Sequence, residues 1–380
     1  MIEPRVNRLL RWLYILRLSM KLGWSKARDL TAYRLCSDCF SDHGLRLTAT
    51  QIGLVHDVTC PNCRSRNGRK LTLQLLHGLA YRFFVWGTLH RSDYGAVPVV
   101  QFNASPHADT FPEPVWPKAD MRLIEDATDI NFFHYEPRFW MLGLNIEPLD
   151  ALKDPFTRAS TIQRIFREFP DTVLRNGELF YRLRKNVERP QDTGQFDTRP
   201  ASLTRHGRLD SERLPVMYAS SDLHICVHEC RVTAEDDSYV ATLAPNRDLR
   251  ILDLTAMLSE PHATEFETLD LTIHMLFLAG EHSYEICRSI AQAASDAGYD
   301  GLAYPSYFSL IKSGHVPFET TYGISHRRIS QLAELEKSKI AQNLALFGRP
   351  LKQRTVRVEC INRLVLRKVS YDYHFGPAVS

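Results

Sequence analysis

The 380-residue chain lacks any run of roughly 18 uncharged apolar residues, the length that a membrane-spanning helix needs. Its eight cysteines are too few for a disulfide scaffold of this size, and their grouping suggests metal binding. It also has no internal repeat and no low-complexity tract. These absences exclude a membrane span and predict a soluble globular protein of the reducing cytoplasm. The composition, 44% apolar and 24% charged residues, is ordinary for such a protein.

Three familiar catalytic motifs are also missing. The "HEC" at 228–230 lacks the second histidine of a zinc-protease helix, and no Gly-Lys-Ser/Thr phosphate loop occurs. No Gly-x-Ser-x-Gly elbow surrounds Ser306, so this serine is not expected to act as an acylating nucleophile.

Charge is unevenly distributed, although the net charge is only +3. Residues 1–100 contain 15 Lys and Arg against 6 Asp and Glu, whereas the rest contains 32 against 38. The basic N-terminal part therefore permits binding to nucleic acid or to an anionic surface. Residues 5–24, "RVNRLLRWLYILRLSMKLGW", predict a packed amphipathic helix, with a targeting or membrane-surface role as the alternatives.

Two Cys-x2-Cys pairs are separated by 20 residues in this basic part, Cys36 with Cys39 and Cys60 with Cys63. Each pair can form a tight knuckle, and two knuckles supply the four thiolates of a tetrahedral zinc site. Because four thiolates leave no position for water, the predicted zinc is structural. Unrelated surface thiols, or two short disulfides, are the alternatives.

A strand and a helix are predicted around residues 207–230, "GRLDSERLPVMYASSDLHICVHEC". Residues 215–219 are typical of a short buried strand, and 220–222 are helix N-cap types. The helix then has an apolar stripe, and Glu229 falls beside it. We expect a partly desolvated carboxylate there that needs a partner, either a cationic ligand or an arginine in a structural salt bridge.

Further strands and helices are predicted on both sides of this stretch. In "NGELFYRLRKN" (176–186), Phe180, Arg182 and Arg184 share one face of a strand. Strands are also expected at 238–244, 249–255, 300–306 and 343–347, with helices at 161–169 and 285–297. Gly298 is a natural C-terminal cap for the last helix.

In this order, the segments "LFYRLR", "GRLDSERLPVMYAS", "VHECR", "SYVATLA", "LRILDLT", "AGYDGLAYPS" and "NLALF" resemble the RES domain over about residues 176–350. The N-terminal "CSDCFSDHGLR" and "CPNC" resemble the zinc-knuckle domain sometimes fused to it. The resemblance implies an α+β fold similar to ADP-ribosyltransferases, with a mixed sheet core, flanking helices and a mainly helical knuckle domain in front. The predicted domains are 1–150 (basic, with the knuckle), 151–175 (connecting helix) and 176–380 (RES-like, with a C-terminal extension).

The same resemblance implies the site residues Arg182, Arg208, Tyr218, Glu229 and Ser306. Glu229 would stabilise the oxocarbenium-like transition state when the nicotinamide–ribose bond of NAD+ breaks. The two arginines would hold the pyrophosphate or an inorganic phosphate, Tyr218 would orient the nicotinamide ring, and Ser306 would hydrogen-bond ribose or phosphate. The structural alternatives are exposed strand charges, a core tyrosine, and a serine that only shapes a turn.

Characterised RES proteins imply an NAD+ phosphorylase or glycohydrolase that acts as a bacterial toxin with an antitoxin or regulatory partner. One alternative is ADP-ribosylation of a protein or nucleic acid. Another is a nucleic-acid-binding knuckle protein with an inactive RES-like part. Residues 307–342 are longer than expected before "NLALF", so the access to Ser306 is not predicted. The sequence also leaves open the nucleophile, the ligand of the N-terminal domain and the oligomeric state.

Overall fold

The computed structural model describes residues 32–104, 118–136, 138–200, 207–260, 262–264, 266–309, 320–321, 324–371, 373 and 375–378. The predicted N-terminal helix lies outside these ranges, as does most of the Pro-rich segment 103–120. The chain divides into two compact units. Unit 1 contains Met1–Arg91, Ala96–Arg138 and Tyr371–Ser380, and unit 2 contains Ser92–Gly95 and Phe139–Ser370. The domain boundaries at 150 and 175 remain a prediction, and residues 139–175 pack as part of unit 2.

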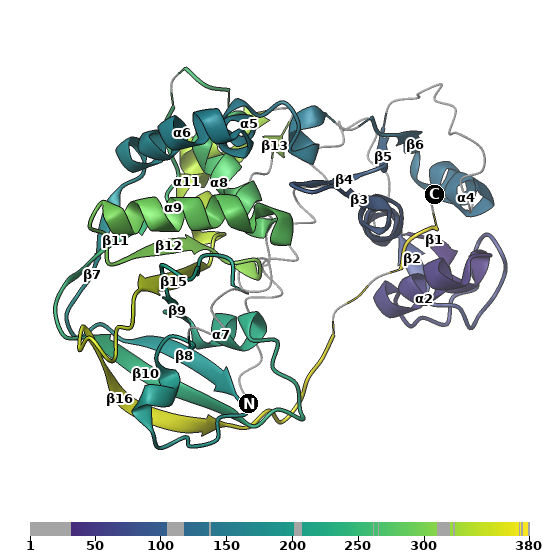
Figure 1. Cartoon of the computed structure of the whole chain (residues 1–380). Helices are drawn as coiled ribbons and strands as arrows, with labels where there is room; N and C mark the ends of the chain where they lie inside the picture. Colours follow the sequence, from purple (N-terminus) through teal and green to yellow (C-terminus); the bar gives the residue numbers. More distant parts are fainter. Residues whose placement is uncertain are drawn as a thin grey trace. The chain divides into compact units, whose positions relative to one another are not determined.

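Unit 1 combines short helices with pairs of short strands (Figure 1). Its elements are β1 (Tyr33–Cys36), η1 (Ser37–Cys39), α2 (His43–Ile52), β2 (Lys70–Thr72), α3 (Leu73–Ala80), η2 (Tyr81–Val85), η3 (Trp86–Thr88), β3 (Leu89–Arg91), β4 (Ala96–Pro98), β5 (Val100–Asn103), α4 (Lys118–Thr128) and β6 (Asn131–His134). The strands pair as β1–β2, β3–β4 and β5–β6. Phe83 and Phe84 are buried with Leu76 and Phe132, so the aromatic residues here form a core.

Unit 2 is built on an eight-stranded mixed sheet, which confirms the predicted α+β class. The strand order is β16-β10-β8-β9-β15-β12-β11-β7, and β11 and β12 are its only parallel pair. The strands are β7 (Asp171–Leu174), β8 (Phe180–Lys185), β9 (Val216–Ser220), β10 (Ser238–Pro245), β11 (Leu249–Asp253), β12 (Gly301–Pro305), β15 (Gln342–Phe347) and β16 (Val356–Leu364).

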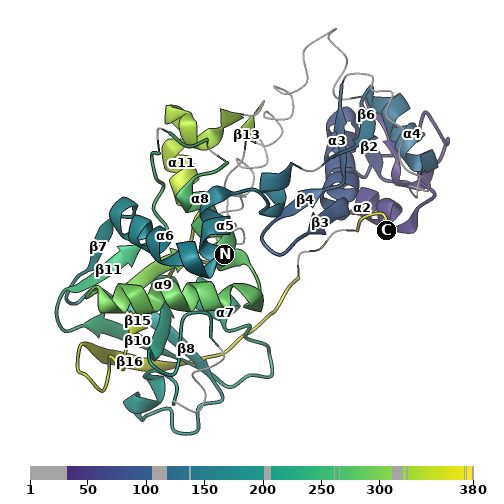
Figure 2. The same cartoon turned by 45° about the horizontal axis from the view of Figure 1, so that its top comes forward.

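Helices cover this sheet, as Figures 1 and 2 show. They are α5 (Glu147–Lys153), α6 (Pro155–Glu168), α7 (Leu223–Glu229), α8 (Leu269–Leu278) and α9 (Tyr284–Asp296). The helices α8 and α9 pack against β12, and α5 and α6 pack against them. Gly298 has φ +82 just after α9, as a C-terminal cap requires. Within the described residues, no helix is both long and apolar enough to cross a bilayer.

The remaining described elements are short. Unit 2 also contains η4 (Phe139–Leu142), η5 (Thr193–Phe196), η7 (Glu281–Ser283), β13 (Thr320–Thr321), β14 (Ile324–Ser325), η8 (His326–Arg328), η9 (Ser330–Leu332) and α11 (Ala333–Ser338). Parts of the long segment 307–342 lie among them. The described part of this segment contains two buried ion pairs, from Arg327 to Asp270 and from Lys339 to Glu336.

A seam divides the large sheet between β8 and β9. These two strands pair at a single position, Tyr181 opposite Ser220, whereas β10 pairs with β8 at six. Beyond that position the backbones of β8 and β9 are no longer paired, and α7 begins just after β9 and packs on both strands. The seam therefore places the polar residues of β8, β9 and α7 near one another.

Candidate active site and metal centre

Helix α7 carries Glu229 as its last residue, and its first turn follows the sequence closely. The carboxylate of Asp222 accepts the N–H groups of His224 at 2.8 Å and Ile225 at 3.1 Å, as an N-cap residue does. Of the predicted apolar stripe, Cys226 is buried against Leu183 and Val240, and the other members are partly buried around it. This anchors the helix and fixes the direction in which Glu229 leaves it.

The carboxylate of Glu229 is held by two neutral donors. Its Oε1 accepts a hydrogen bond from Ser306 Oγ at 2.6 Å and another from Asn343 Nδ2 at 2.6 Å. Both donors are buried, Ser306 at 1% and Asn343 at 3% exposure. Among the described residues, Oε2 receives no hydrogen bond, and Glu229 as a whole is exposed. The expected desolvation is therefore wrong: buried partners fix one oxygen, but the residue itself is exposed.

Arg182 crosses the seam from β8 to β9. Its Nη1 donates to the carbonyl of Tyr218 at 2.6 Å, and its Nη2 donates to the carbonyl of Asp197 at 3.1 Å. The side chain is only 6% exposed, and burial lowers the pKa of this guanidinium to about 10, helped by the charge of Arg184. Arg182 therefore remains a cation at neutral pH, and its contacts position β9.

Tyr218 uses its hydroxyl to hold the loop that carries Arg208. The oxygen donates to Asp210 Oδ1 at 2.8 Å and accepts the N–H groups of Leu209 at 2.8 Å and Asp210 at 3.2 Å. Burial raises the pKa of this phenol, and the charge of Asp210 raises it further. Gly207 lies against the side chain of Asp210, and a Cβ added at Gly207 would meet the Asp210 carboxylate at 1.7 Å. The loop conformation therefore depends on a glycine at 207 and a hydroxyl at 218.

Arg208 points from that loop to the end of α8. Its guanidinium donates to the carbonyls of Leu276 at 3.1 Å and Ala279 at 2.8 Å, where the C-terminus of a helix favours a cation. It also lies over the ring of Tyr284, 4.8 Å from its centroid. Both predicted arginines thus donate to backbone carbonyls, and their role as pyrophosphate ligands remains a prediction.

Tyr304 links these groups, although the sequence did not single it out. Burial raises the pKa of its phenol well above the usual value, the charges of Glu229 and Tyr218 raise it further, and Arg208 opposes them. Three of the predicted residues, Glu229, Tyr218 and Arg208, therefore influence one partly buried phenol electrostatically. Direct hydrogen bonds join Glu229 to Ser306 and Arg182 to Tyr218, whereas in the described part of the chain Arg208 is hydrogen-bonded to none of the other four.

Sequence reasoning missed Asn343, the second donor to Glu229. The residue opens the apolar segment "NLALF", and a polar residue at the start of a buried strand was the signal available. It also missed the aromatic contact of His228, whose ring stacks on Phe308 with centroids 5.4 Å apart. Burial lowers the pKa of His228, and the neighbouring His224 lowers it further. The residue next to Glu229 is therefore a neutral imidazole that stacks on a phenyl ring.

We expect Tyr218→Phe to destabilise unit 2 by about 1–3 kcal/mol, because the N–H groups of Leu209 and Asp210 lose their acceptor. Denaturant unfolding of the two proteins measures this. The matched control is Tyr239→Phe, whose hydroxyl has one contact, to Asp237 at 3.2 Å. Equal stability losses in the two variants would show that the Tyr218 hydroxyl does not hold the loop.

The metal centre lies in unit 1, where the four predicted cysteines meet. The Sγ of Cys36 lies 3.8 Å from that of Cys39 and 3.4 Å from that of Cys63, and Cys39 lies 3.6 Å from Cys60. A tetrahedral ion with metal–sulfur bonds near 2.3 Å places its sulfurs about 3.8 Å apart. All four ligand atoms lie within 4.8 Å of one another, so the residues fit a four-thiolate metal site.

Without a cation, burial disfavours the thiolate forms of Cys36 and Cys39 in this cluster. Burial raises the pKa of Cys36, the contact with Cys63 raises it further, and burial likewise raises the pKa of Cys39 to about 11. The pKa of Cys60 is lowered despite burial, because the N–H groups of Cys63 and Asn62 stabilise its thiolate. A bound cation would favour all four thiolates, which agrees with a metal-binding role.

The backbone around the cluster is closely packed. An added Cβ at Gly68 would meet the Sγ of Cys36 at 2.6 Å. The ammonium of Lys70 is fully buried and donates to the carbonyls of Ser65, Arg66 and Gly68 at 3.3, 3.0 and 2.7 Å. This buried cation fixes the turn after the second knuckle.

Comparison with known proteins agrees with the fold of unit 2. Residues 179–316 match the family model of the RES domain. A search of curated proteins gave no significant match. A chain in the crystal structure of the M. tuberculosis MbcT-MbcA toxin-antitoxin complex has 16% sequence identity and a TM-score of 0.31, over 54% of this chain and 91% of that one. At that TM-score the likeness supports no inference.

The family match covers Arg182, Arg208, Tyr218, Glu229 and Ser306. It ends before Asn343, which the fold brings back to Glu229 along β15. The resemblance predicted from the sequence is therefore confirmed by a match to the RES domain model over residues 179–316.

Proposed function

We propose that this protein cleaves the nicotinamide–ribose bond of NAD+. The observation that carries the proposal is the carboxylate of Glu229, an exposed residue whose Oε1 is held by two buried donors within the stretch that matches the RES domain. When the bond breaks, nicotinamide leaves with the electron pair, and positive charge develops on the ribose. A fixed carboxylate beside that carbon stabilises the charge more in the transition state than in the substrate.

The other residues prepare this carboxylate and its surroundings. Ser306 and Asn343 fix the direction of Glu229, so little reorganisation is needed as charge develops. Arg182 holds β9 across the seam, and Tyr218 holds the loop of Arg208. Both arginines keep their positive charge, so they attract the pyrophosphate of NAD+ or an inorganic phosphate even while bound to carbonyls.

The acceptor of the ADP-ribosyl group defines the reaction, and we propose water or inorganic phosphate. Purified full-length protein with NAD+ labelled in its adenine ring should give ADP-ribose without phosphate or ADP-ribose-1″-phosphate with it, both detected by mass spectrometry. Label attached to protein or nucleic acid would instead establish transfer to a macromolecule. A protein partner that blocks the pocket, as an antitoxin would, is the regulation that the family resemblance implies.

We propose zinc as the metal of unit 1, with a structural role. Four sulfurs at tetrahedral spacing are the donor set that zinc takes in closed structural sites. When bound, the ion would tie β1 and η1 to the turn after Cys60. This unit would carry the recognition or regulatory function of the protein.

Asn343→Asp tests whether Asn343 positions the Glu229 carboxylate. The new carboxylate would lie against Glu229, and two like charges at that distance cannot both ionise easily, so the pKa of the pair must rise. If ionised Glu229 is required, the acidic limb of the pH–kcat profile should move to higher pH, by about one unit or more. Asn362→Asp on the exposed part of β16 is the control and should leave the profile unchanged. Identical profiles for wild type and Asn343→Asp would refute this role.

A further inference from the structure

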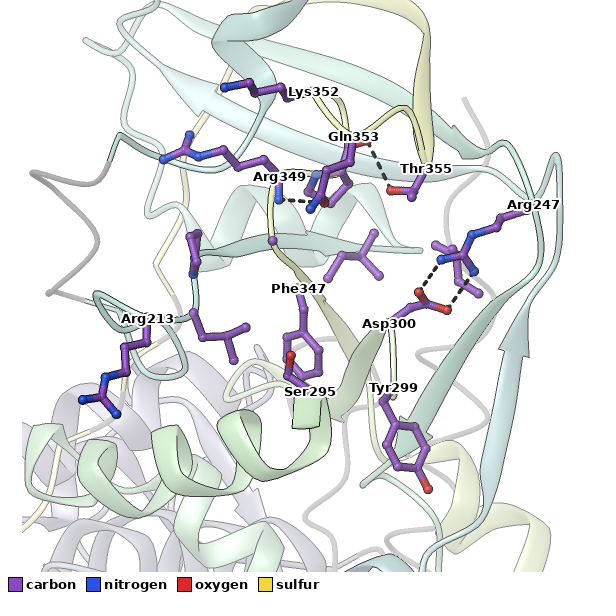
Figure 3. Close-up of a pocket in the computed structure, with 16 residues that line it drawn as sticks. Arg213, Arg247, Ser295, Tyr299, Asp300, Phe347, Arg349, Lys352, Gln353 and Thr355 are labelled. Carbon is purple, nitrogen blue, oxygen red and sulfur yellow. Dashed lines mark hydrogen bonds and ion pairs between the residues drawn. The ribbon is translucent and has the colours of Figure 1, made fainter. Parts of the chain in front are cut away.

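Unit 2 contains a hollow of about 840 Å³ that the proposed reaction does not use. It lies at the start of β9 and the end of β15, whereas Glu229 binds Asn343 at the opposite end of β15 (Figure 3). Phe347, which lines the hollow, is four residues beyond Asn343. At about 3.3 Å per residue, that is roughly 13 Å along the strand. The hollow is therefore separate from the candidate active site.

The charges that line this hollow are unbalanced. Four cations and one carboxylate, Asp300, line it. Arg247 already neutralises Asp300 through two contacts, at 2.6 and 3.0 Å. Among the described residues, neither the guanidinium of Arg213 nor the ammonium of Lys352 has a partner, and both residues are exposed. Arg213 and Lys352 therefore contribute positive charge that no described carboxylate balances.

Arg349 adds a third cation, and the turn that carries it is well fixed. Among the described residues, its guanidinium donates to the carbonyls of Thr198 and Arg199 alone, at 3.3 Å each. Gly348 has φ +80 and donates its N–H to the carbonyl of Pro215 at 2.8 Å. Figure 3 shows Arg213, Arg349 and Lys352 on one side of the hollow and the Arg247–Asp300 pair on the other. The backbone of the turn and the guanidinium of Arg349 are therefore held in place before any ligand arrives.

An apolar wall completes the hollow beside these cations. Leu214, Leu346 and Phe347 all line the hollow, and Figure 3 shows Phe347 between the two charged sides. The volume falls within the roughly 300–1,000 Å³ of small-molecule sites, and such sites combine apolar walls with a few polar groups. A lone inorganic ion would leave the apolar wall uncovered, whereas a nucleotide has a planar base for the wall and phosphates for the cations.

We propose that this hollow binds a nucleoside polyphosphate at a second site, separate from the site of Glu229. The base packs on the apolar wall around Phe347. Arg213, Arg349 and Lys352 bind the phosphates, for which arginine supplies paired N–H donors. The inference goes beyond the proposed NAD+ cleavage and does not depend on it. A nucleotide bound there would stabilise unit 2 to an extent that depends on its concentration in the cell.

Isothermal titration with ATP tests the site on the full chain at constant ionic strength. The variant Arg213→Ala/Lys352→Ala should lose at least about tenfold in affinity for ATP. The control Arg367→Ala/Lys368→Ala removes the same charge from exposed positions of unit 2 and should bind as the wild type does. Equal losses in both double variants, or no binding of ATP by the wild type, would overturn the proposal.

Two further titrations show whether the base of ATP contributes to binding and at which site ATP binds. Inorganic triphosphate should bind more weakly than ATP, because it cannot cover the apolar wall, and equal affinities would refute the nucleotide assignment. Glu229→Gln should retain the wild-type affinity for ATP, whether or not the protein cleaves NAD+. A loss of ATP binding in Glu229→Gln would place the nucleotide in the candidate active site instead.

Discussion

Glu229→Gln should lower kcat for nicotinamide release from NAD+ by about 100- to 1,000-fold, the usual cost of losing one electrostatic stabiliser of a transition state. The amide oxygen of glutamine can still accept the hydrogen bonds of Ser306 and Asn343. The variant therefore keeps the local geometry and removes only the negative charge. The measurement is steady-state nicotinamide release, with thermal unfolding as a check on the fold.

The control for this variant is Glu235→Gln, which removes a carboxylate from another exposed position of the same unit. Its kcat should equal that of the wild type. If Glu229→Gln retains the wild-type kcat, the carboxylate does not stabilise the transition state. If both variants lose activity equally, the effect is one of overall charge.

Removing the metal should unfold unit 1. Structural zinc contributes an apparent binding free energy of about 10–16 kcal/mol in small sites, as much as or more than the roughly 5–15 kcal/mol by which whole domains are stable. We expect one zinc per chain by elemental analysis. After chelation, hydrogen exchange should show loss of amide protection in residues 32–91, 96–104 and 118–136, while the strands of unit 2 stay protected.

A substitution in the cluster should have the same effect as chelation. Cys39→Ala removes one of four ligands, whereas Cys360→Ala removes an exposed thiol of unit 2. Only the first should lower the zinc content and the protection of unit 1. Wild-type protection in a metal-free Cys39→Ala protein would contradict a structural role for the metal.

Local signals predicted much of the fold. Asp222 caps α7 as its side chain suggested, and Gly298 ends α9. The two Cys-x2-Cys pairs meet because each knuckle is a local turn, and the pairing of β1 with β2 brings the turns together. Helix α8 was missed because it is apolar on all sides: nearly all of its residues are buried, so it has no stripe for a periodic pattern to reveal.

The candidate site was predicted less completely, because long-range pairing builds it. The motif order placed Glu229 and Ser306, but Asn343 reaches them only through the pairing of β15 with β9 and β12. The exposure of Glu229 also depends on the seam between β8 and β9, which no local pattern encodes. Likewise, the carbonyls that Arg182 and Arg208 bind come from segments 15 to 71 residues away.

The most direct test of the proposed reaction is a chromatographic assay of NAD+ incubated with the purified wild-type chain, with mass detection of products. We expect stoichiometric release of nicotinamide together with a product that retains the ADP-ribose moiety. NAD+ that stays intact with and without phosphate, in the presence of zinc-loaded, folded protein, would contradict it.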